Sequence, residues 1–325
     1  MATGNYFAAS REVPLTEEEK QAWFNKRTRE EWIEYWYKEQ VPADTRLEWP
    51  NNVRKIEPEK FPPTIGEWKK IPARDGYEIP VLVYKPKRTG KTPVYFQIHG
   101  GGMTTGHPLT NDFECTLYNQ RLDILVISID YRLAPEYQYP IPLQDCYDVV
   151  KYCYDHADEW NIDVDHMGIG GCSSGAHFSI DLCVMAAQEK APFKLRFLNL
   201  LYPGIDWFVI PDTSDDAIEA NQMYINCYID QAKEIDNPQC NPFAIPDEIL
   251  RTFPSTLMLT AGGDWMSVSG KLFADKLIDN YVKVNSWCVE GAAHAFTIHF
   301  PASWDEERAP KAQEYILEAF KQYLL

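Results

Sequence analysis

Short apolar segments alternate with helical segments from about residue 90 to the end of the chain, and this alternation limits the fold more than any other feature. Residues 124–129 form an almost unbroken apolar run with several β-branched side chains, which is typical of a strand buried on both faces. Strands that alternate with helices build a mostly parallel sheet covered by helices on both sides. We therefore expect an α/β protein.

The same pattern sets approximate bounds for each element. Strands are expected at residues 67–71, 77–84, 93–98, 124–129, 167–171, 195–201, 256–260 and 284–289. Helices are expected at residues 14–40, 112–121, 142–159, 174–188, 267–280 and 309–323. Residues 205–250 interrupt the alternation and are rich in Asp, Asn, Pro and aromatic residues, so we interpret them as an insertion between two core strands.

Charge and composition exclude several classes of partner. The chain has 31 Lys and Arg residues against 48 Asp and Glu residues, and its formal net charge of −17 disfavours nucleic acid and anionic membranes. No apolar run approaches the roughly 18 residues of a membrane span, and residues 1–20 lack the apolar core of a signal peptide. The eight cysteines include no Cys-x-x-Cys pair, so we expect a reducing, cytoplasmic location without disulfides.

The segment Gly171-Cys172-Ser173-Ser174-Gly175 matches the pattern Gly-x-Ser-x-Gly between an expected strand and an expected helix. A nucleophile elbow requires this setting, because the glycines let the chain bend sharply and present the central hydroxyl above the sheet. Ser173 is therefore the candidate nucleophile. Ser174 is a weaker candidate because no glycine lies two residues before it, and Cys172 is expected to pack rather than to react. A Gly/Ser-rich turn without chemistry is the alternative.

A serine hydroxyl is a weak nucleophile and needs a base. When an elbow of this kind carries the serine, the acid and then the histidine follow it along the chain. His294 comes just after the last expected strand, among small residues that let a loop bring its ring to Ser173. His177, in the helix after the elbow, is expected to be a packing or solvated residue, and His299 is a weaker candidate for the base.

The base in turn needs a carboxylate that orients it. Asp264 directly follows the strand expected at 256–260, after two glycines that allow the loop to turn back over the sheet edge. Asp275 and Asp279 belong to the polar face of an expected helix, and Glu290 is a further rival. We therefore expect Asp264 to bind one ring nitrogen of His294 and to fix its tautomer.

A glycine-rich loop, His99-Gly100-Gly101-Gly102, follows the strand expected at 93–98. Three consecutive glycines leave backbone N–H groups bare, and such groups stabilise the oxyanion of acyl transfer together with the N–H that follows the nucleophile. The expected donors are Gly101, Gly102 and Ser174, whereas His99 is expected to be structural. A phosphate loop is the weaker alternative, because the segment lacks both the Lys-Ser/Thr and the Gly-x-Gly-x-x-Gly patterns.

With these motifs, and with the heptapeptide Asp130-Tyr131-Arg132-Leu133-Ala134-Pro135-Glu136, the chain resembles the hormone-sensitive-lipase-like (bacterial family IV) carboxylesterases of the α/β-hydrolase superfamily. The resemblance covers about residues 65–325. It implies an α/β-hydrolase fold, with an eight-stranded mostly parallel sheet flanked by helices. It also implies a core of residues 66–204 and 251–325, and a helical cap formed by residues 1–65 and 205–250. Cys172 and Ala176 depart from the family pattern and affect the expected pocket shape.

The expected function is hydrolysis of short- to medium-chain carboxylic esters through an acyl-enzyme on Ser173, with no metal and no cofactor. The expected partner is a small-molecule ester, and the oligomeric state stays open. An amide or aryl-formamide hydrolase with the same triad is the first alternative. A non-catalytic small-molecule receptor and a lipase acting at an interface are the others, although the N-terminal region contains no basic, apolar membrane-binding helix.

Overall fold

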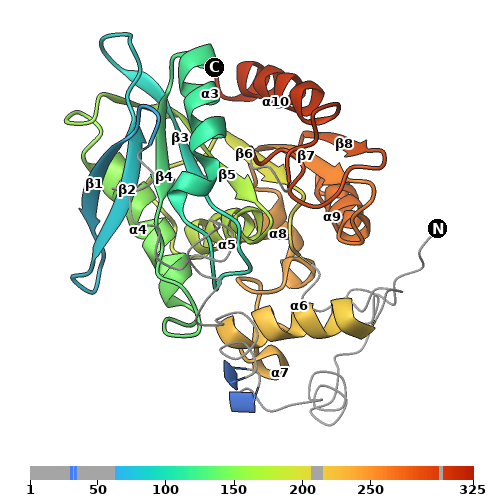
Figure 1. Cartoon of the computed structure of the whole chain (residues 1–325). Helices are drawn as coiled ribbons and strands as arrows, with labels where there is room; N and C mark the ends of the chain where they lie inside the picture. Colours follow the sequence, from blue (N-terminus) through green and yellow to red (C-terminus); the bar gives the residue numbers. More distant parts are fainter. Residues whose placement is uncertain (1–29, 32, 35–62, 206–214, 300–302) are drawn as a thin grey trace.

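One eight-stranded sheet organises the part of the chain that the structure describes (Figure 1). The computed structural model describes residues 30–31, 33–34, 63–205, 215–299 and 303–325. The strands are β1 (Glu67–Pro72), β2 (Glu78–Tyr84), β3 (Thr92–Ile98), β4 (Leu125–Ile129), β5 (Ile162–Cys172), β6 (Phe197–Leu201), β7 (Ser255–Ala261) and β8 (Val284–Val289). Their order across the sheet is β1-β2-β4-β3-β5-β6-β7-β8.

Two strands at one edge run against their neighbours. β1 pairs antiparallel with β2, and β2 pairs antiparallel with β4, whereas every pair from β4 to β8 is parallel. Every residue of β3, β4 and β6 is buried, as their apolar sequences indicate for strands covered on both faces. The predicted α/β-hydrolase fold with an eight-stranded, mostly parallel sheet is confirmed.

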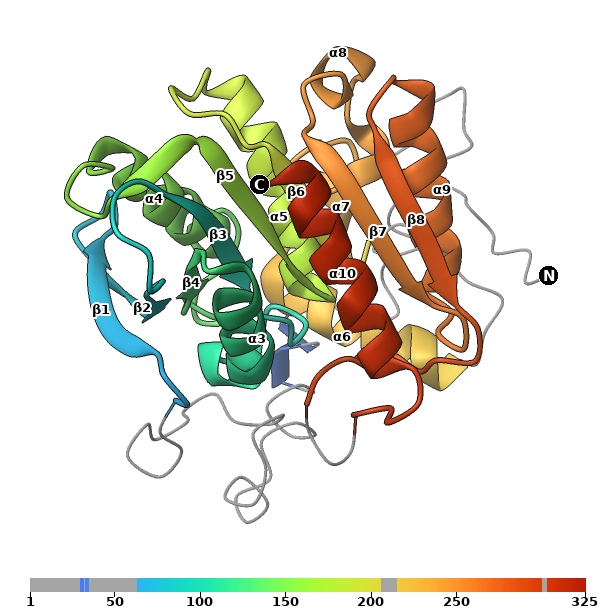
Figure 2. The ribbon, with the colours of Figure 1, turned by 90° about the horizontal axis from the view of Figure 1, so that it is seen from above.

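Helices cover both faces of the sheet (Figure 2). On one face lie α3 (Asp112–Leu122) and α10 (Ala309–Tyr323), and on the other lie α4 (Ile141–Asp155), α5 (Ser174–Gln188) and α9 (Ser267–Asp279). The first layer packs through aromatic rings: Phe320 of α10 contacts Tyr118 of α3 and Tyr95 of β3, with ring centroids 4.9 and 4.7 Å apart. No described helix combines the length and the apolar composition needed to cross a membrane.

Two elements differ from their predicted bounds by four residues or more. β5 begins five residues before the predicted 167–171, because Ile162 pairs with Thr92 of β3, and the mostly polar residues 163–166 fall in the register shift that follows. The helix predicted at 142–159 ends at Asp155, where the His156 N–H closes the last turn on the Tyr152 carbonyl. In both places the end of the strand or helix lies among mostly polar, partly or fully exposed residues, so the apolar pattern of the sequence did not mark it.

Residues 205–250 contain further helices, which lie between β6 and β7 in sequence. They are α6 (Asp215–Tyr228), α7 (Gln231–Glu234), the 3-10 helix η3 (Pro242–Ala244) and α8 (Asp247–Leu250). The helix predicted at 14–40 lies outside the described residues, apart from residues 30, 31, 33 and 34, which are helical. The assignment of residues 1–65 and 205–250 to a cap therefore stays a prediction.

The carboxyl ends of five parallel strands lead into the loops that carry the candidate site. β3, β5, β6, β7 and β8 end at Ile98, Cys172, Leu201, Ala261 and Val289 respectively. In open α/β sheets, ligands bind outside this edge. The glycine loop, the elbow, the acid and the base all follow these strand ends.

We expect Gly170→Ala to lower the free energy of unfolding by about 3 kcal/mol, because overpacking at the sheet centre has no way to relax. A Cβ atom at Gly170 would lie 2.2 Å from the carbonyl oxygen of Asn199 and 2.6 Å from Oη of Tyr95. At Gly168, the matched control in the same strand, it would lie 3.2 Å from Cδ1 of Leu324, a side-chain end that can move. Urea titration of Gly170→Ala and Gly168→Ala checks this, and equal losses would contradict it.

Candidate active site

Ser173 occupies a strained turn between β5 and α5. Its backbone has φ 54° and ψ −121°, a combination that is costly for a residue with a side chain. Its N–H donates to the Leu201 carbonyl at 3.0 Å. Cβ atoms at Gly171 and Gly175 would lie 2.2 and 2.1 Å from the carbonyl oxygen of Ile98. Only glycine fits beside β3 at these two positions, which explains their place on either side of the serine.

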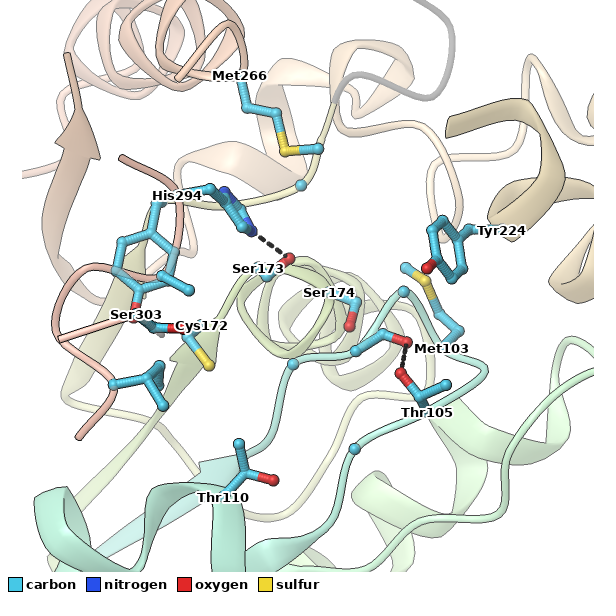
Figure 3. Close-up of a pocket in the computed structure, with 18 of the residues that line it drawn as sticks. Met103, Thr105, Thr110, Cys172, Ser173, Ser174, Tyr224, Met266, His294 and Ser303 are labelled. Atoms are coloured by element: carbon cyan, nitrogen blue, oxygen red, sulfur yellow. Dashed lines mark hydrogen bonds between the residues drawn. The ribbon is translucent and has the colours of Figure 1, made fainter. Parts of the chain in front are cut away.

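The structure brings Ser173, His294 and Asp264 together in one hydrogen-bonded chain. Figure 3 shows the part of this chain that joins His294 to Ser173. Nε2 of His294 lies 2.9 Å from Oγ of Ser173, and Nδ1 of His294 lies 2.5 Å from Oδ2 of Asp264. The Asp264 side chain is 4% exposed and the His294 side chain 35%. The ring is therefore open to a substrate on one side, while the carboxylate behind it is shielded from water.

Two loops hold the acid and the base in register. The N–H of Gly262 donates to the Val289 carbonyl at 2.7 Å, and the N–H of Gly263 donates to the Ala292 carbonyl at 2.8 Å. Oδ1 of Asp264 also accepts the N–H of Met266 at 3.1 Å. These bonds tie the loop after β7 to the loop after β8, so the distance between carboxylate and imidazole depends on backbone contacts rather than on side-chain freedom.

The glycine loop curls beside the serine. Gly101 has φ 126° and Gly102 has φ 58°, and the Gly101 carbonyl accepts the N–H of Thr105 at 2.9 Å. A Cβ atom at Gly100 would lie 3.2 Å from Cβ of Ser173, so the loop backbone passes directly beside the nucleophile candidate. Within the described residues, no hydrogen bond is made by the N–H groups of Gly101, Gly102 and Ser174. These donors are free to bind an oxyanion.

His99 ties the start of this loop down. Its ring is buried, its Nδ1 lies 2.8 Å from the Gly100 carbonyl oxygen, and it stacks on Tyr131 at 4.2 Å. The Tyr131 hydroxyl donates to the His99 carbonyl at 3.1 Å. Burial lowers the pKa of His99 to about 3, so the ring is neutral. This arrangement fits the structural role expected for it.

The rival residues lie away from the serine hydroxyl. His299 is exposed and stacks on Phe113 with ring centroids 4.3 Å apart. Asp275 and Asp279 lie on the exposed side of α9, and Glu290 is exposed after β8. His177 is fully buried beneath the elbow, so of the two roles expected for it, packing and solvated, the structure shows the packing one.

A cavity of about 390 Å³ opens in front of the serine. Ser173, His294 and the glycine loop line it, together with Tyr224 and Ile225 of α6. Tyr224 lies across the serine from His294 (Figure 3). Sequence reasoning missed these two residues, because nothing in the 205–250 pattern says which side chains turn towards the core. Ring atoms of Tyr224 would lie 2.7 Å from a Cβ atom at Gly102, so α6 packs directly on the glycine loop.

Cys172 lines the cavity next to the nucleophile candidate. Its thiol is buried, and burial raises its pKa to about 12. The thiol is therefore neutral at physiological pH, and a neutral thiol is a poor nucleophile. Among the described residues there is also no cluster of three or more His, Cys, Asp or Glu side chains that could hold a metal ion.

Glu114 is a buried acid near the site that the sequence pattern did not reveal. It is 2% exposed, its Oε1 accepts the N–H of His299 at 3.3 Å, and its Oε2 has no partner among the described residues. Burial raises its pKa to about 8. At neutral pH Glu114 is therefore mostly protonated, and it adds little negative charge behind Cys172.

We expect Glu114→Gln to become progressively more stable than the wild type as pH rises from about 4.5 to about 8. The folded-state pKa of about 8 lies above the ordinary value of 4.5, so the folded wild type binds more protons in that window and loses stability as pH rises. The slope is about 1.4 kcal/mol per pH unit and vanishes above pH 8. Urea titrations at several pH values measure it. The exposed Glu248→Gln is the control, and an equal slope there would contradict the assignment.

A family model and several known proteins match parts of this chain. A family model described as the α/β-hydrolase fold matches residues 95–298. An arylesterase of Saccharolobus solfataricus is 26% identical over 244 residues, which cover 71% of this chain and 78% of the relative. An arylacetamide deacetylase of Oryctolagus cuniculus is 32% identical over 154 residues, which cover 45% of this chain and 39% of the relative.

A solved structure is also similar. Carboxyl esterase 2 of the mycorrhizal fungus Tuber melanosporum superimposes with a TM-score of 0.71 at 25% identity, covering 80% of this chain and 87% of that one. The segment matched by the family model contains Ser173, Asp264, His294 and the whole glycine loop. The chain therefore belongs to the α/β-hydrolase family, in the hormone-sensitive-lipase-like branch that its sequence motifs indicated.

Proposed function

We propose that the protein is a serine carboxylesterase that hydrolyses short- to medium-chain carboxylic esters through Ser173, His294 and Asp264. One observation carries the proposal: hydroxyl, imidazole and carboxylate form a continuous hydrogen-bonded chain at the carboxyl edge of the sheet. Its relatives, which include an arylesterase, and its likeness to a carboxyl esterase structure support an ester as the substrate.

In the acylation half of the reaction, Oγ of Ser173 attacks the ester carbonyl while Nε2 of His294 takes its proton. The tetrahedral intermediate places its oxyanion against the N–H groups of Gly101, Gly102 and Ser174. The imidazolium then gives its proton to the leaving alcohol, and the acyl group stays on Ser173. Asp264 accepts a hydrogen bond from the Nδ1–H of His294 throughout, which fixes the tautomer and stabilises the imidazolium.

In the deacylation half, a water molecule replaces the alcohol. His294 removes its proton, the resulting hydroxide attacks the acyl carbonyl, and the same N–H groups hold the second oxyanion. Collapse of this intermediate returns the proton to Oγ of Ser173 and releases the carboxylic acid. No step requires a group that this chain does not supply.

The cavity wall supports acyl groups of modest length. Met103, Ile225, Met266 and Ile298 contribute apolar side chains around the serine. The volume of about 390 Å³ lies near the lower end of ordinary small-molecule sites, which suits a short or medium chain. Because α6 supplies one side of the cavity, we also propose that residues 205–250 act as part of a cap, with residues 1–65 as the other part.

The cysteines support a cytoplasmic location, which we propose for this enzyme. All eight are free, and seven of them are buried. Unpaired thiols in this number are typical of a reducing compartment. The oligomeric state stays open.

An amide hydrolase using the same triad is the second candidate, and the likeness to an arylacetamide deacetylase favours it. The two candidates differ only in the bond that is cleaved. Comparing p-nitrophenyl acetate with p-nitroacetanilide separates them, because both carry an acetyl group and release a chromophore. Each rate constant is divided by that of the uncatalysed reaction, because the ester is intrinsically the more reactive substrate. A larger enhancement for the ester supports the carboxylesterase, and a larger enhancement for the anilide supports the amide hydrolase.

The wild type is expected to hydrolyse p-nitrophenyl acetate, butyrate and octanoate faster than palmitate, because the cavity favours short and medium chains. Ser173→Ala should lower kcat by at least about 10⁴-fold, since it removes the nucleophile. Ser174→Ala, which keeps the backbone N–H, should retain most of the activity. A wild type inert on all four esters, or one that prefers palmitate, would sink the proposal in this form.

Asp264→Asn is expected to lower kcat by about 10⁴-fold with little change in KM, because the amide favours the wrong tautomer of His294. Asp275→Asn, on the exposed side of α9, provides a matched control for the same change. Steady-state kinetics with p-nitrophenyl butyrate measure both variants. Equal activity of the two would remove Asp264 from the triad.

A further inference from the structure

The helix that follows the nucleophile carries a second histidine and a second aspartate, one turn apart and fully buried. Nε2 of His177 lies 3.2 Å from Oδ2 of Asp181, and neither side chain is accessible to solvent. The mechanism proposed above uses neither residue. A buried titratable pair directly beneath the elbow calls for a physical explanation, because isolated charges are excluded from protein interiors.

Oxygen acceptors face both ring nitrogens of His177. Nδ1 lies 2.8 Å from the carbonyl oxygen of Gly204, and Nε2 lies 3.2 Å from the carbonyl oxygen of Cys240. A carbonyl oxygen can only accept, so a ring that carries a proton on both nitrogens satisfies both contacts at once. The doubly protonated ring is an imidazolium, and the Asp181 carboxylate beside it supplies the opposite charge.

The Asp181 carboxylate has no other means of compensation within the described structure. Apart from the contact with His177, neither of its oxygens has a hydrogen-bond partner there. Burial raises the pKa of Asp181 to about 6, and the neighbouring His177 opposes that rise. The carboxyl group is therefore mostly ionised at neutral pH, as the imidazolium requires.

One of the two carbonyls lies just before the insertion 205–250, and the other lies towards its end. Gly204 immediately precedes it, and its N–H donates to the Ser173 carbonyl at 3.1 Å. Cys240 lies in its second half, in a buried turn closed by the Cys240 N–H on the Asn237 carbonyl at 3.0 Å. The His177 side chain on α5 thus contacts the chain at two places, where it leaves the core after β6 and where it approaches the core again before β7.

The insertion reaches the cavity through α6. Tyr224 and Ile225 of this helix line the cavity, and Tyr224 packs on Gly102 of the glycine loop. We propose that His177 and Asp181 form a buried imidazolium–carboxylate pair that positions both ends of the insertion on α5 and thereby sets the shape of the substrate cavity. Both are positioning residues, and the inference rests on the proposed function because it takes the cavity as the ester site.

Selectivity between substrates tests this role. We compare kcat/KM for p-nitrophenyl octanoate with kcat/KM for p-nitrophenyl acetate in the wild type, His177→Asn, Asp181→Asn and the double variant. The ratio does not depend on the fraction of active enzyme, so a loss of stability alone leaves it unchanged. Ser179→Ala is the matched control, because Ser179 is buried in the same helix but bonds only to the Gly175 carbonyl, at 2.8 Å.

Each single variant is expected to change the ratio at least fivefold. The double variant should change it no further than a single variant does, because both remove the same pair. Ser179→Ala should stay within twofold of the wild type. Ratios within twofold of the wild type for all variants would overturn the positioning role. A wild type inert on both esters would instead reject the proposed function.

A measurement on the wild type keeps the inference testable if the variants do not fold. Nitrogen-15 NMR of protein labelled at histidine distinguishes an imidazolium from a neutral ring. Burial lowers the pKa values of His99 and His107, the other buried rings, to about 3 and about 4, so a protonated ring that is insensitive to inhibition of Ser173 and to surface exposure is His177. We expect both His177 nitrogens to give the shifts of a protonated ring at pH 7.5. A neutral His177, paired with a protonated Asp181, would overturn the ion pair.

Discussion

The backbone of Ser173, held at a positive φ between β5 and α5, is the constraint on which the site depends. Such a conformation costs of order 1–3 kcal/mol and persists only where the surroundings enforce it. Here the enforcement comes from β3, whose last carbonyl sits where any side chain at Gly171 or Gly175 would have to be. The Ser173 hydroxyl projects above the sheet edge because close packing against β3 allows the turn between β5 and α5 no other backbone conformation.

Strain of the same kind recurs around the cavity. Met103, Tyr202 and Ala295 also have positive φ values, of 62°, 36° and 62°, and all three line the cavity with Ser173. They stand next to the glycine loop, at the end of β6 and next to His294. Backbone strain concentrated in this way is typical of functional sites, where an unfavourable local conformation is tolerated because it fixes the geometry. The donors and the base are therefore fixed before a substrate arrives, which is the condition for electrostatic stabilisation of an oxyanion.

Local sequence patterns were sufficient to predict several parts of this molecule. The strand–turn–helix around Ser173 and the small residues around His294 are local, so their placement followed from the pattern. The proximity of Ser173 and His294 could also be predicted, because the loops that follow parallel strands all lie at the same edge of the sheet. The true start of β5 was missed because only Ile162 pairs with β3 there, and the mostly polar residues 163–166 that follow it lie in a register shift.

Long-range contacts lay beyond the sequence pattern. Nothing in the sequence indicates that the carbonyl oxygens of Gly204 and Cys240, 27 and 63 residues after His177, contact its ring. Nothing in the sequence around Tyr224 indicates that its ring packs on the glycine loop. Glu114 has the sequence context of an ordinary acidic residue in the first turn of a helix, so its burial could not be predicted. In each case the environment is set by the packing of the insertion and of the loop after β8, which only the folded chain specifies.

The central claim is that Ser173 is the nucleophile, and covalent labelling tests it most directly. Diethyl p-nitrophenyl phosphate reacts with an activated serine, forms an O–P bond to its Oγ and releases p-nitrophenolate. We predict one diethylphosphoryl group per chain, placed by fragmentation mass spectrometry on Ser173, with labelling strongly slowed in His294→Ala. A label on Ser174 or Cys172, or no label on a folded wild type, would contradict the account.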